Sequence, residues 1–116
     1  VLAGITPTPP SKIIGKTALG ADQTVPWMYR ASVLEALDVL EAKGYELFAL
    51  ELTEDAEDIF ETQVPDKCAV ILGNEVAGVS AEVLERCRRR VSIPMAGHKS
   101  SLNVAVAFGI AGFQLR

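Results

Sequence analysis

Hydrophobic positions follow the period of an α-helix in three segments of this chain. In 32–45 ("SVLEALDVLEAKGY") they recur with helical spacing, Ser32 can cap the first turn and Gly44 can end the helix. A second helix is expected over 81–89, where Ser80 precedes early glutamates and late arginines, as the helix dipole favours. A third, nearly charge-free helix is expected to begin near Ser101 and run to the end of the sequence.

Apolar residues without helical spacing predict β-strands. The predicted strands are 1–6 ("VLAGIT"), 46–52 ("ELFALEL"), 68–75 ("CAVILGNE") and 91–95 ("VSIPM"). The continuous apolar run of 68–75 is typical of a strand buried on both faces of a parallel sheet. The acids of 55–60 ("DAEDIF") indicate a short helix or turn. The stretch 11–28 has no sustained periodicity, which favours a functional loop or short strand pieces.

The alternation of strands and helices predicts an α/β fold with right-handed crossovers and a parallel sheet covered by helices on both faces. In such sheets ligands bind beyond the carboxyl ends of the strands. Three segments are expected there: 50–53, 72–75 and 94–97.

The last apolar run, 102–115, is shorter than the roughly 20 residues that a membrane helix needs, so a buried helix and no membrane association are expected. Gly109 and Gly112 leave a surface on which another backbone can approach closely. Either the sheet or a second subunit can fill that surface, and the pattern alone does not choose between them.

Composition adds limits rather than a function. The 116 residues are 49% hydrophobic and 22% charged, which is typical of one compact domain. A net charge of -4 argues weakly against nucleic acid, so any RNA surface would be a local patch. Two cysteines and one histidine indicate neither a disulfide framework nor a metal site, and they fit the reducing cytoplasm. A first residue of Val rather than Met, without a signal-peptide pattern, suggests a piece of a longer product.

The glycines of "GNEVAG" (73–78) have the spacing of a phosphate-binding loop. Val79-Ser80 stands where such a loop needs Lys followed by Ser or Thr, and no G-x-G-x-x-G occurs, so neither a nucleoside triphosphatase nor an ordinary dinucleotide fold is indicated. A tight turn before the Ser80 helix also explains the glycines, alone or together with a ligand role.

Polar residues gather between the last strand and the last helix. Asn103, a lone amide expected in the first turn of an apolar helix, needs hydrogen-bond partners in a loop or in a ligand. His98 reads more readily as an exposed loop residue than as a general base. The arginines at 86 and 88–90 read more readily as a solvated helix end than as an RNA patch, and the cysteines as small buried hydrophobic residues.

Taken together, 69–80 ("AVILGNEVAGVS") followed by 91–110 ("VSIPMAGHKSSLNVAVAFGI") resembles the second and third motifs of the TrmH/SpoU branch of the SPOUT RNA methyltransferases. "LAGITPTPP" (2–10) also resembles the strand that precedes them in the family. The resemblance implies one methyltransferase catalytic domain over 1–116: a parallel sheet with flanking helices and a C-terminal deep trefoil knot, lacking the family's first strand and helix.

The resemblance further implies S-adenosylmethionine as cofactor, methyl transfer to a ribose 2′-hydroxyl of tRNA or rRNA, and a homodimer formed through the last helix. Residues matching the family's cofactor positions are Leu50, Glu51, Leu72, Gly73, Asn74, Ile93, Met95, Ser101 and Leu102. Those nearest the chemistry would be Glu75, Asn103 and Ser101. RNA contacts are expected at Lys16, Arg30, His98 and Lys99, and Trp27 belongs to the same variable stretch or is a local packing anchor.

One departure from the family keeps a second function open. The family's first motif, with the arginine thought to activate the ribose hydroxyl, lies before "LAGITP", and no residue of this sequence matches it. A non-catalytic RNA-binding or assembly module that keeps the knot is therefore the alternative. A flavodoxin-like nucleotide-binding domain is disfavoured because the phosphate loop is absent.

Overall fold

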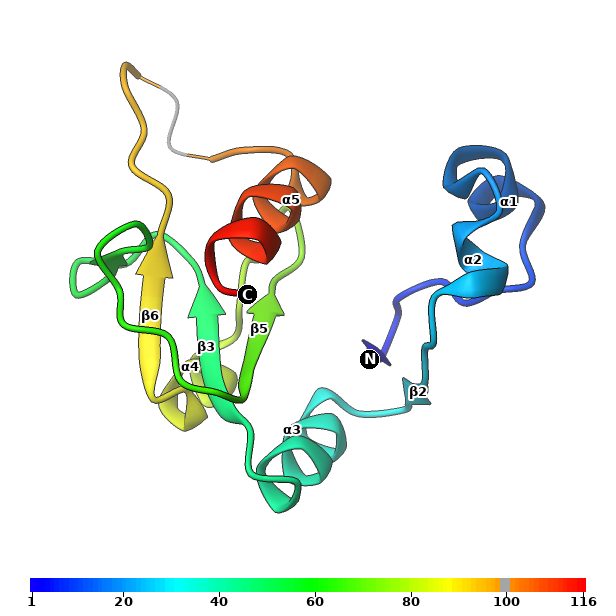
Figure 1. Cartoon of the computed structure of the whole chain (residues 1–116), viewed down its shortest axis with the longest axis horizontal. Coiled ribbons are helices and arrows are strands. Elements are labelled where there is room, and N and C mark those ends of the chain that lie inside the picture. The colour runs from blue at the N-terminus through cyan, green and yellow to red at the C-terminus, as the bar shows by residue number, and fades with distance from the viewer. Residues whose placement is uncertain (99–100) are drawn as a thin grey trace. The chain divides into compact units, whose positions relative to one another are not determined.

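A computed structural model describes residues 1–98 and 101–116, which form two compact units, 1–39 and 40–116 (Figure 1). In the first unit, strand β1 (Leu2–Ala3) pairs in parallel with β2 (Tyr29–Arg30). Helices α1 (Lys12–Ala18) and α2 (Ala21–Thr24) lie between them in sequence.

The predictions for this first unit need two corrections. The stretch 11–28 contains two short helices and not a loop or strand pieces; no residue of either helix is buried, so no apolar stripe marked them in the sequence. The strand predicted over 1–6 is reduced to Leu2–Ala3. At Gly4 a φ of +59° turns the chain out of the extended conformation.

Helix α3 spans Val33–Ala42, which confirms the prediction that Ser32 caps it and that Gly44 ends it. The Ser32 hydroxyl accepts a hydrogen bond from the Leu34 N–H at 3.1 Å, and Gly44 ends the helix with a φ of +78°.

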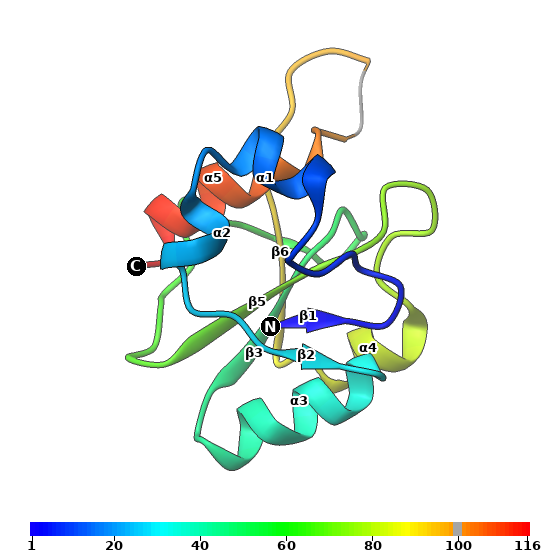
Figure 2. The ribbon, with the colours of Figure 1, turned by 90° about the vertical axis from the view of Figure 1, so that its right-hand side faces the viewer.

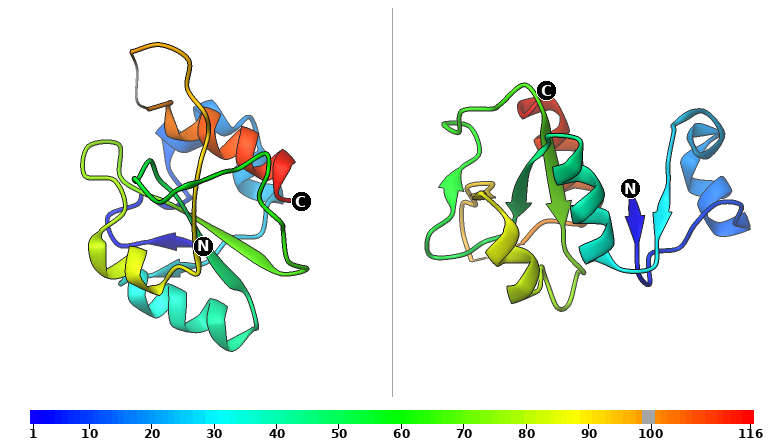
Figure 3. Two further views of the ribbon diagram at one scale, coloured as in Figure 1. Left: turned by 90° about the vertical axis from the view of Figure 1, so that its left-hand side faces the viewer. Right: turned by 90° about the horizontal axis from the view of Figure 1, so that it is seen from below.

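The second unit contains a four-stranded parallel sheet, which confirms the predicted α/β class. Its strands are β3 (Glu46–Leu50), β4 (Glu57–Asp58), β5 (Cys68–Leu72) and β6 (Arg89–Ser92), in the order β4-β6-β3-β5. Helix α4 (Ala81–Arg86) lies on one face and α5 (Val104–Gln114) on the other (Figures 2 and 3).

The core of this unit lies between the sheet and α5. Phe48, Ile59, Val91 and Ala111 are completely buried there, and Leu115 closes the cluster. Because side chains alternate along a strand, Leu47 and Ala49 face the opposite side of the sheet, where they are buried as well. Strand β3 is therefore buried on both faces, as a central parallel strand should be.

The last helix contacts a strand on the other side of β3 from the strand that precedes it. Strands β5 and β6 flank β3 on opposite sides, yet α5, which follows β6, contacts β5. The described residues between β6 and α5 are 93–98 and 101–103, here called the returning connection, and they leave β6 at the carboxyl end of the sheet (Figure 1). Ile93 and Met95 of this connection line one cavity with residues of the segment that follows β5.

Several elements differ from those predicted: β3 ends at Leu50, β5 at Leu72 and β6 at Ser92, before the predicted ends at 52, 75 and 95. Residues 57–58 form β4 and not a helix, because Glu57 and Asp58 pair with Val91 and Ser92 of β6. Helix α4 ends at Arg86 and β6 already begins at Arg89. The last helix starts at Val104, beyond Ser101.

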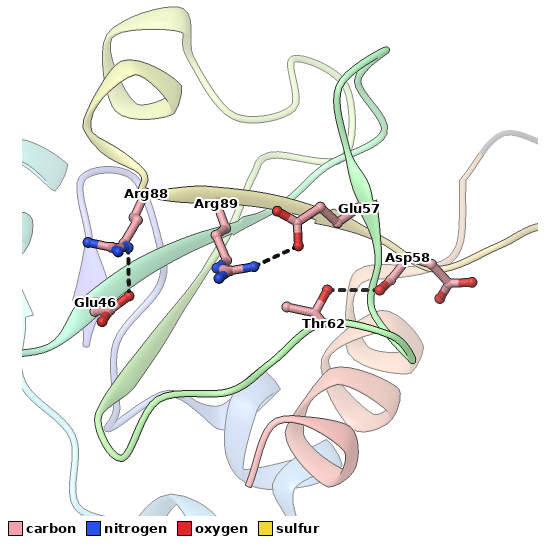
Figure 4. A network of polar contacts seen from close by, with 6 residues as sticks. All are labelled: Glu46, Glu57, Asp58, Thr62, Arg88 and Arg89. Atoms are coloured by element: carbon pink, nitrogen blue, oxygen red, sulfur yellow. Dashed lines mark hydrogen bonds and ion pairs between the residues drawn. The ribbon is translucent and has the colours of Figure 1, made fainter.

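The arginines at the end of α4 and in the residues that follow it are paired with acids from other segments. Arg88 contacts Glu46 at 3.1 Å and Arg89 contacts Glu57 at 2.8 Å (Figure 4). Arg90 contacts Asp55 at 2.7 Å. Arg86 is paired with Glu41. In Figure 4 the Thr62 hydroxyl also donates to the Asp58 carbonyl at 2.8 Å, which holds the segment after β4. These arginines tie strands and loops together, so they form no unpaired basic patch.

Cys68 and Cys87 are half-buried free thiols. Burial raises the pKa of Cys68 to about 11 and also raises the pKa of Cys87. Both are protonated at neutral pH, in keeping with the predicted packing role. Within the described residues, no helix is long and apolar enough to span a membrane.

Candidate functional site

A cavity of about 720 Å³ opens at the carboxyl ends of β3, β5 and β6, within the second unit. Its size is in the range of small-molecule sites. Its walls come from the ends of the three strands, the loop after β5, the returning connection and the first turn of α5. All three predicted strand-end segments contribute to it.

The loop 73–79 forms one wall and is closed on itself. Asn74 and Gly78 exchange two backbone hydrogen bonds, of 3.1 and 2.8 Å. The Asn74 side-chain oxygen also accepts from the N–H groups of Val76 at 2.8 Å and Ala77 at 3.2 Å. These bonds satisfy the loop's own polar groups, so its shape is largely preformed.

Glycine is required at both ends of this loop. A Cβ on Gly73 would collide with the backbone of Gly78 and Val79, and Gly78 itself has a φ of +66°. The tight-turn interpretation of these glycines is therefore confirmed, together with their place in the cavity wall. The space that a side chain at position 73 would occupy is filled by the loop's own backbone.

Glu51 connects the loop to the end of β3. Its Oε2 atom accepts a hydrogen bond from the Val79 N–H at 2.9 Å, and its Oε1 atom accepts from the Leu52 N–H at 3.2 Å. The side chain is half-buried and lies in the cavity wall. A charged acceptor makes such bonds stronger than a neutral one would.

Asn103 is the N-cap of α5 and does not lie in its first turn. Its Oδ1 atom accepts a hydrogen bond from the Ala105 N–H at 2.9 Å, and its carbonyl accepts from Ala107 at the same distance. The partner that the sequence required is thus the helix itself. With Oδ1 accepting the cap bond, the side-chain N–H groups remain as donors to a ligand.

Every residue predicted for cofactor binding or for the chemistry lines this cavity. They are Leu50, Glu51, Leu72, Gly73, Asn74, Glu75, Ile93, Met95, Ser101, Leu102 and Asn103. The predicted RNA contacts are not brought together there. His98 is exposed, Lys99 is outside the described residues, and Lys16 and Arg30 belong to the first unit, where Arg30 donates to the Tyr29 carbonyl at 2.8 Å.

Sequence reasoning missed several residues of the wall. They are Leu52, Val76, Ala77, Gly78, Val79, Ser92, Val104 and Ala107. The whole "GNEVAG" loop carried a usable signal, because a turn between two close glycines brings all its residues to one edge. Val104 and Ala107 lie in the first turn of α5. They were missed because the helix was predicted to begin near Ser101 and begins at Val104.

The charges of the wall restrict the ligand. Glu51 and Glu75 are acidic, and among the described lining residues none is basic. Such a wall does not suit a phosphate or another anion, and it favours a neutral or cationic molecule. In the described part of the chain, no three histidine, cysteine or acidic residues form a group that could hold a metal ion.

Comparisons with known proteins agree with this geometry. The RlmB protein of Burkholderia sp, named a 23S rRNA (guanosine-2'-O-)-methyltransferase, is 37% identical over 100 residues, which cover 85% of this chain and 40% of the relative. The crystal structure of an AdoMet-bound rRNA methyltransferase from Sinorhizobium meliloti matches with a TM-score of 0.90 and 28% identity, over 99% of this chain and 44% of that one.

A third match is the A. aeolicus TrmH/SpoU tRNA modifying enzyme, with a TM-score of 0.83 and 26% identity, over 99% of this chain and 60% of that chain. The chain spans about two fifths of the length of the curated relatives it matches. The model of the SpoU rRNA Methylase family matches residues 4–113. This chain therefore belongs to the SpoU rRNA methylase family, the TrmH/SpoU group that its motifs resemble.

Proposed function

We propose that residues 1–116 form the catalytic domain of an S-adenosylmethionine-dependent RNA ribose 2′-O-methyltransferase. The observation that carries the proposal is the cavity, which gathers all the residues expected to bind cofactor or to take part in the chemistry. The names of the relatives support the reaction, since they are rRNA and tRNA methyltransferases, and one was solved with AdoMet bound.

The cavity fits this cofactor in its chemistry. Leu72, Ile93, Met95 and Leu102 offer apolar surface of the kind that an adenine ring requires, beside strand-end backbone groups that can pair with its edge. The two acidic residues and the absence of basic ones in the described wall suit a sulfonium cation. When bound, S-adenosylmethionine supplies a methyl group on a positively charged sulfur.

The residues of this chain would act mainly by positioning. Asn103 and Ser101 can donate hydrogen bonds into the cavity, which orients the bound molecules. The exposed Glu75 carboxylate has no hydrogen bond or ion pair to the described residues, so it can accept a hydrogen bond from an approaching hydroxyl. Holding a nucleophile in line with a reactive methyl group accounts for much of the rate of such a transfer.

We also propose that the returning connection is threaded, as in the trefoil knot that the family resemblance implies. The chain leaves β6 on one side of β3 and enters α5, which contacts β5 on the other side. Ile93 of the connection and Val79 of the loop 73–79 line one cavity. A crystal structure that traces 93–103 relative to 73–79 tests this directly. A connection that passes outside that loop would contradict the knot.

The partner expected from the last helix is a second copy of this chain. Helix α5 exposes Val106, Phe108 and Phe113 to 52%, 57% and 73% of their area, and a Cβ on Gly109 or Gly112 would meet nothing within 4 Å. Helix packing on such a face would remove large apolar side chains from water. RNA contacts at Lys16, Arg30, His98 and Lys99, and a cytoplasmic location, stay predictions.

Calorimetric titration of this chain with S-adenosylhomocysteine tests the cofactor part of the proposal, because product binding needs no RNA. We expect saturable binding at one site per chain. Transfer of a labelled methyl group to rRNA and tRNA transcripts by this chain then tests the reaction. Cofactor binding without transfer to any RNA would support the non-catalytic module, and a folded chain that binds no cofactor would contradict the proposal.

A further inference from the structure

The carboxylate of Glu51 occupies a junction between three parts of the cavity wall. Its residue follows β3 directly, and its backbone N–H donates to the Val91 carbonyl of β6 at 3.0 Å. Its Oε2 atom accepts from the Val79 N–H at 2.9 Å, at the end of the loop 73–79. The backbone of Glu51 is thus anchored in the sheet while its side chain reaches the loop.

The Glu51 carboxylate lies directly against Gly78 of the loop. A Cβ on Gly78 would come within 2.5 Å of the Glu51 Oε2 atom. The bonds of Asn74 close the loop internally, but they do not attach it to the neighbouring strand. The Val79–Glu51 bond makes that attachment to the end of β3.

We infer that Glu51 is a positioning residue that holds the loop 73–79 against the end of β3 and so maintains the shape of the cofactor cavity. The inference rests on the proposed function and gives Glu51 a role other than the direct cofactor contact that the sequence predicts. The role requires an acceptor at Oε2 and does not require a negative charge.

Two substitutions separate the acceptor from the charge. Glu51→Ala removes both, whereas Glu51→Gln removes the charge and keeps one oxygen that can accept from the Val79 N–H. Glu54, an exposed carboxylate three residues along the chain that does not line the cavity, provides a matched control as Glu54→Ala. Thermal unfolding of each variant shows whether it is folded.

Hydrogen exchange at the Val79 amide tests the attachment without any ligand. We expect exchange about tenfold faster in Glu51→Ala than in the unsubstituted chain, as loss of a bond to a charged acceptor predicts. The rates in Glu51→Gln and Glu54→Ala should stay within about threefold of the original. Unchanged exchange in a folded Glu51→Ala chain would overturn the inference, whatever the cofactor does.

Calorimetric titration with S-adenosylhomocysteine and S-adenosylmethionine tests the consequence. We expect Glu51→Ala to weaken the binding of both ligands by the same factor, about tenfold. Glu51→Gln should restore most of the affinity. A larger loss for S-adenosylmethionine, with Gln as weak as Ala, would show charge recognition of the sulfonium and would overturn the inference. If the unsubstituted chain binds neither ligand, the proposed function fails, and the exchange measurement still decides the role of Glu51 in the loop.

A second position gives an independent check. Gly78→Ala adds a methyl group where the carboxylate lies, and Gly44→Ala adds one at a similar positive φ, +78° against +66°, with nothing within 4 Å. We expect Gly78→Ala to weaken the binding of S-adenosylhomocysteine and Gly44→Ala to leave that binding unchanged. The Glu51→Ala/Gly78→Ala double variant should lose little more than Gly78→Ala alone, because both changes break one attachment. Fully additive losses would contradict it.

Discussion

The side-chain oxygen of Asn103 accepts a hydrogen bond from the Ala105 N–H at 2.9 Å, which makes this cavity residue the N-cap of α5. One side chain therefore has two possible duties. Its oxygen begins the helix, and its amide N–H groups are free to face a ligand because an amide carries donors and an acceptor on separate atoms.

Substitutions at Asn103 separate these duties. We expect Asn103→Ala to lower the free energy of unfolding by about 1 kcal/mol through loss of the cap. The same substitution should also weaken the binding of S-adenosylhomocysteine. Asn103→Ser should keep the cap, since serine caps helices well, but still reduce ligand affinity or methyl transfer about tenfold. Urea unfolding and calorimetric titration measure the two effects. Full affinity and activity in Asn103→Ser would remove Asn103 from the site.

Gly73→Ala should damage the loop rather than fill the cavity. The added Cβ runs into the backbone of Gly78 and Val79, so the loop must open, and we expect a loss of about 1–3 kcal/mol of stability with at least tenfold weaker ligand binding. Gly15→Ala in α1 is the control, because the nearest atom to its Cβ, Asp22 Oδ2, is 4.0 Å away. Equal effects of the two substitutions would show that the loop tolerates opening.

The Cys68 thiol predicts a loss of stability in alkaline solution. Burial raises its pKa to about 11 from an ordinary value of 9.0, so between these values the unfolded chain releases a proton that the folded chain retains. The free energy of unfolding should therefore fall as the pH rises from 9 to 11. Urea midpoints at about pH 8 and about pH 10.5 should show a smaller fall in Cys68→Ala. An equal fall of the urea midpoint in the unsubstituted chain and in Cys68→Ala would contradict this role of Cys68.

The exposed face of α5 predicts self-association. Phe113→Asp, which replaces the more exposed of the two phenylalanines, should shift the chain towards the monomer in sedimentation velocity at micromolar concentration. Phe60→Asp is the control, since Phe60 is 53% exposed outside this helix. A monomer before any substitution would contradict the proposed homodimer.

Much of the fold and of the site could be predicted because their signals are local. The Ser32 cap and the Gly44 stop act within one turn of helix, and the apolar runs that became β3 and β5 need no partner to be recognised. The cavity residues followed from strand ends and from motifs that keep their spacing.

The errors occurred where a distant segment decides the structure. Glu57 and Asp58 have little strand propensity and form β4 because β6 offers them a ladder. Arg89 and Arg90 continue a helical charge pattern, yet they extend in β6, where Glu57 and Asp55 pair with them. Helices α1 and α2 bury no residue, so the sequence contains no hydrophobic periodicity that would predict them.

The sequence by itself therefore determined the class of fold, the family motifs and the residues at the strand ends, since these depend on periodicity and turn chemistry over a few neighbouring positions. Only the tertiary structure shows why glycine stands at position 73 and glutamate at position 51. The space at Gly73 belongs to the loop's own backbone, and Glu51 meets Val79 across 28 positions of chain. Steric exclusion and hydrogen bonding act over a few ångströms in space, and the strand order chooses which distant residues come within that range.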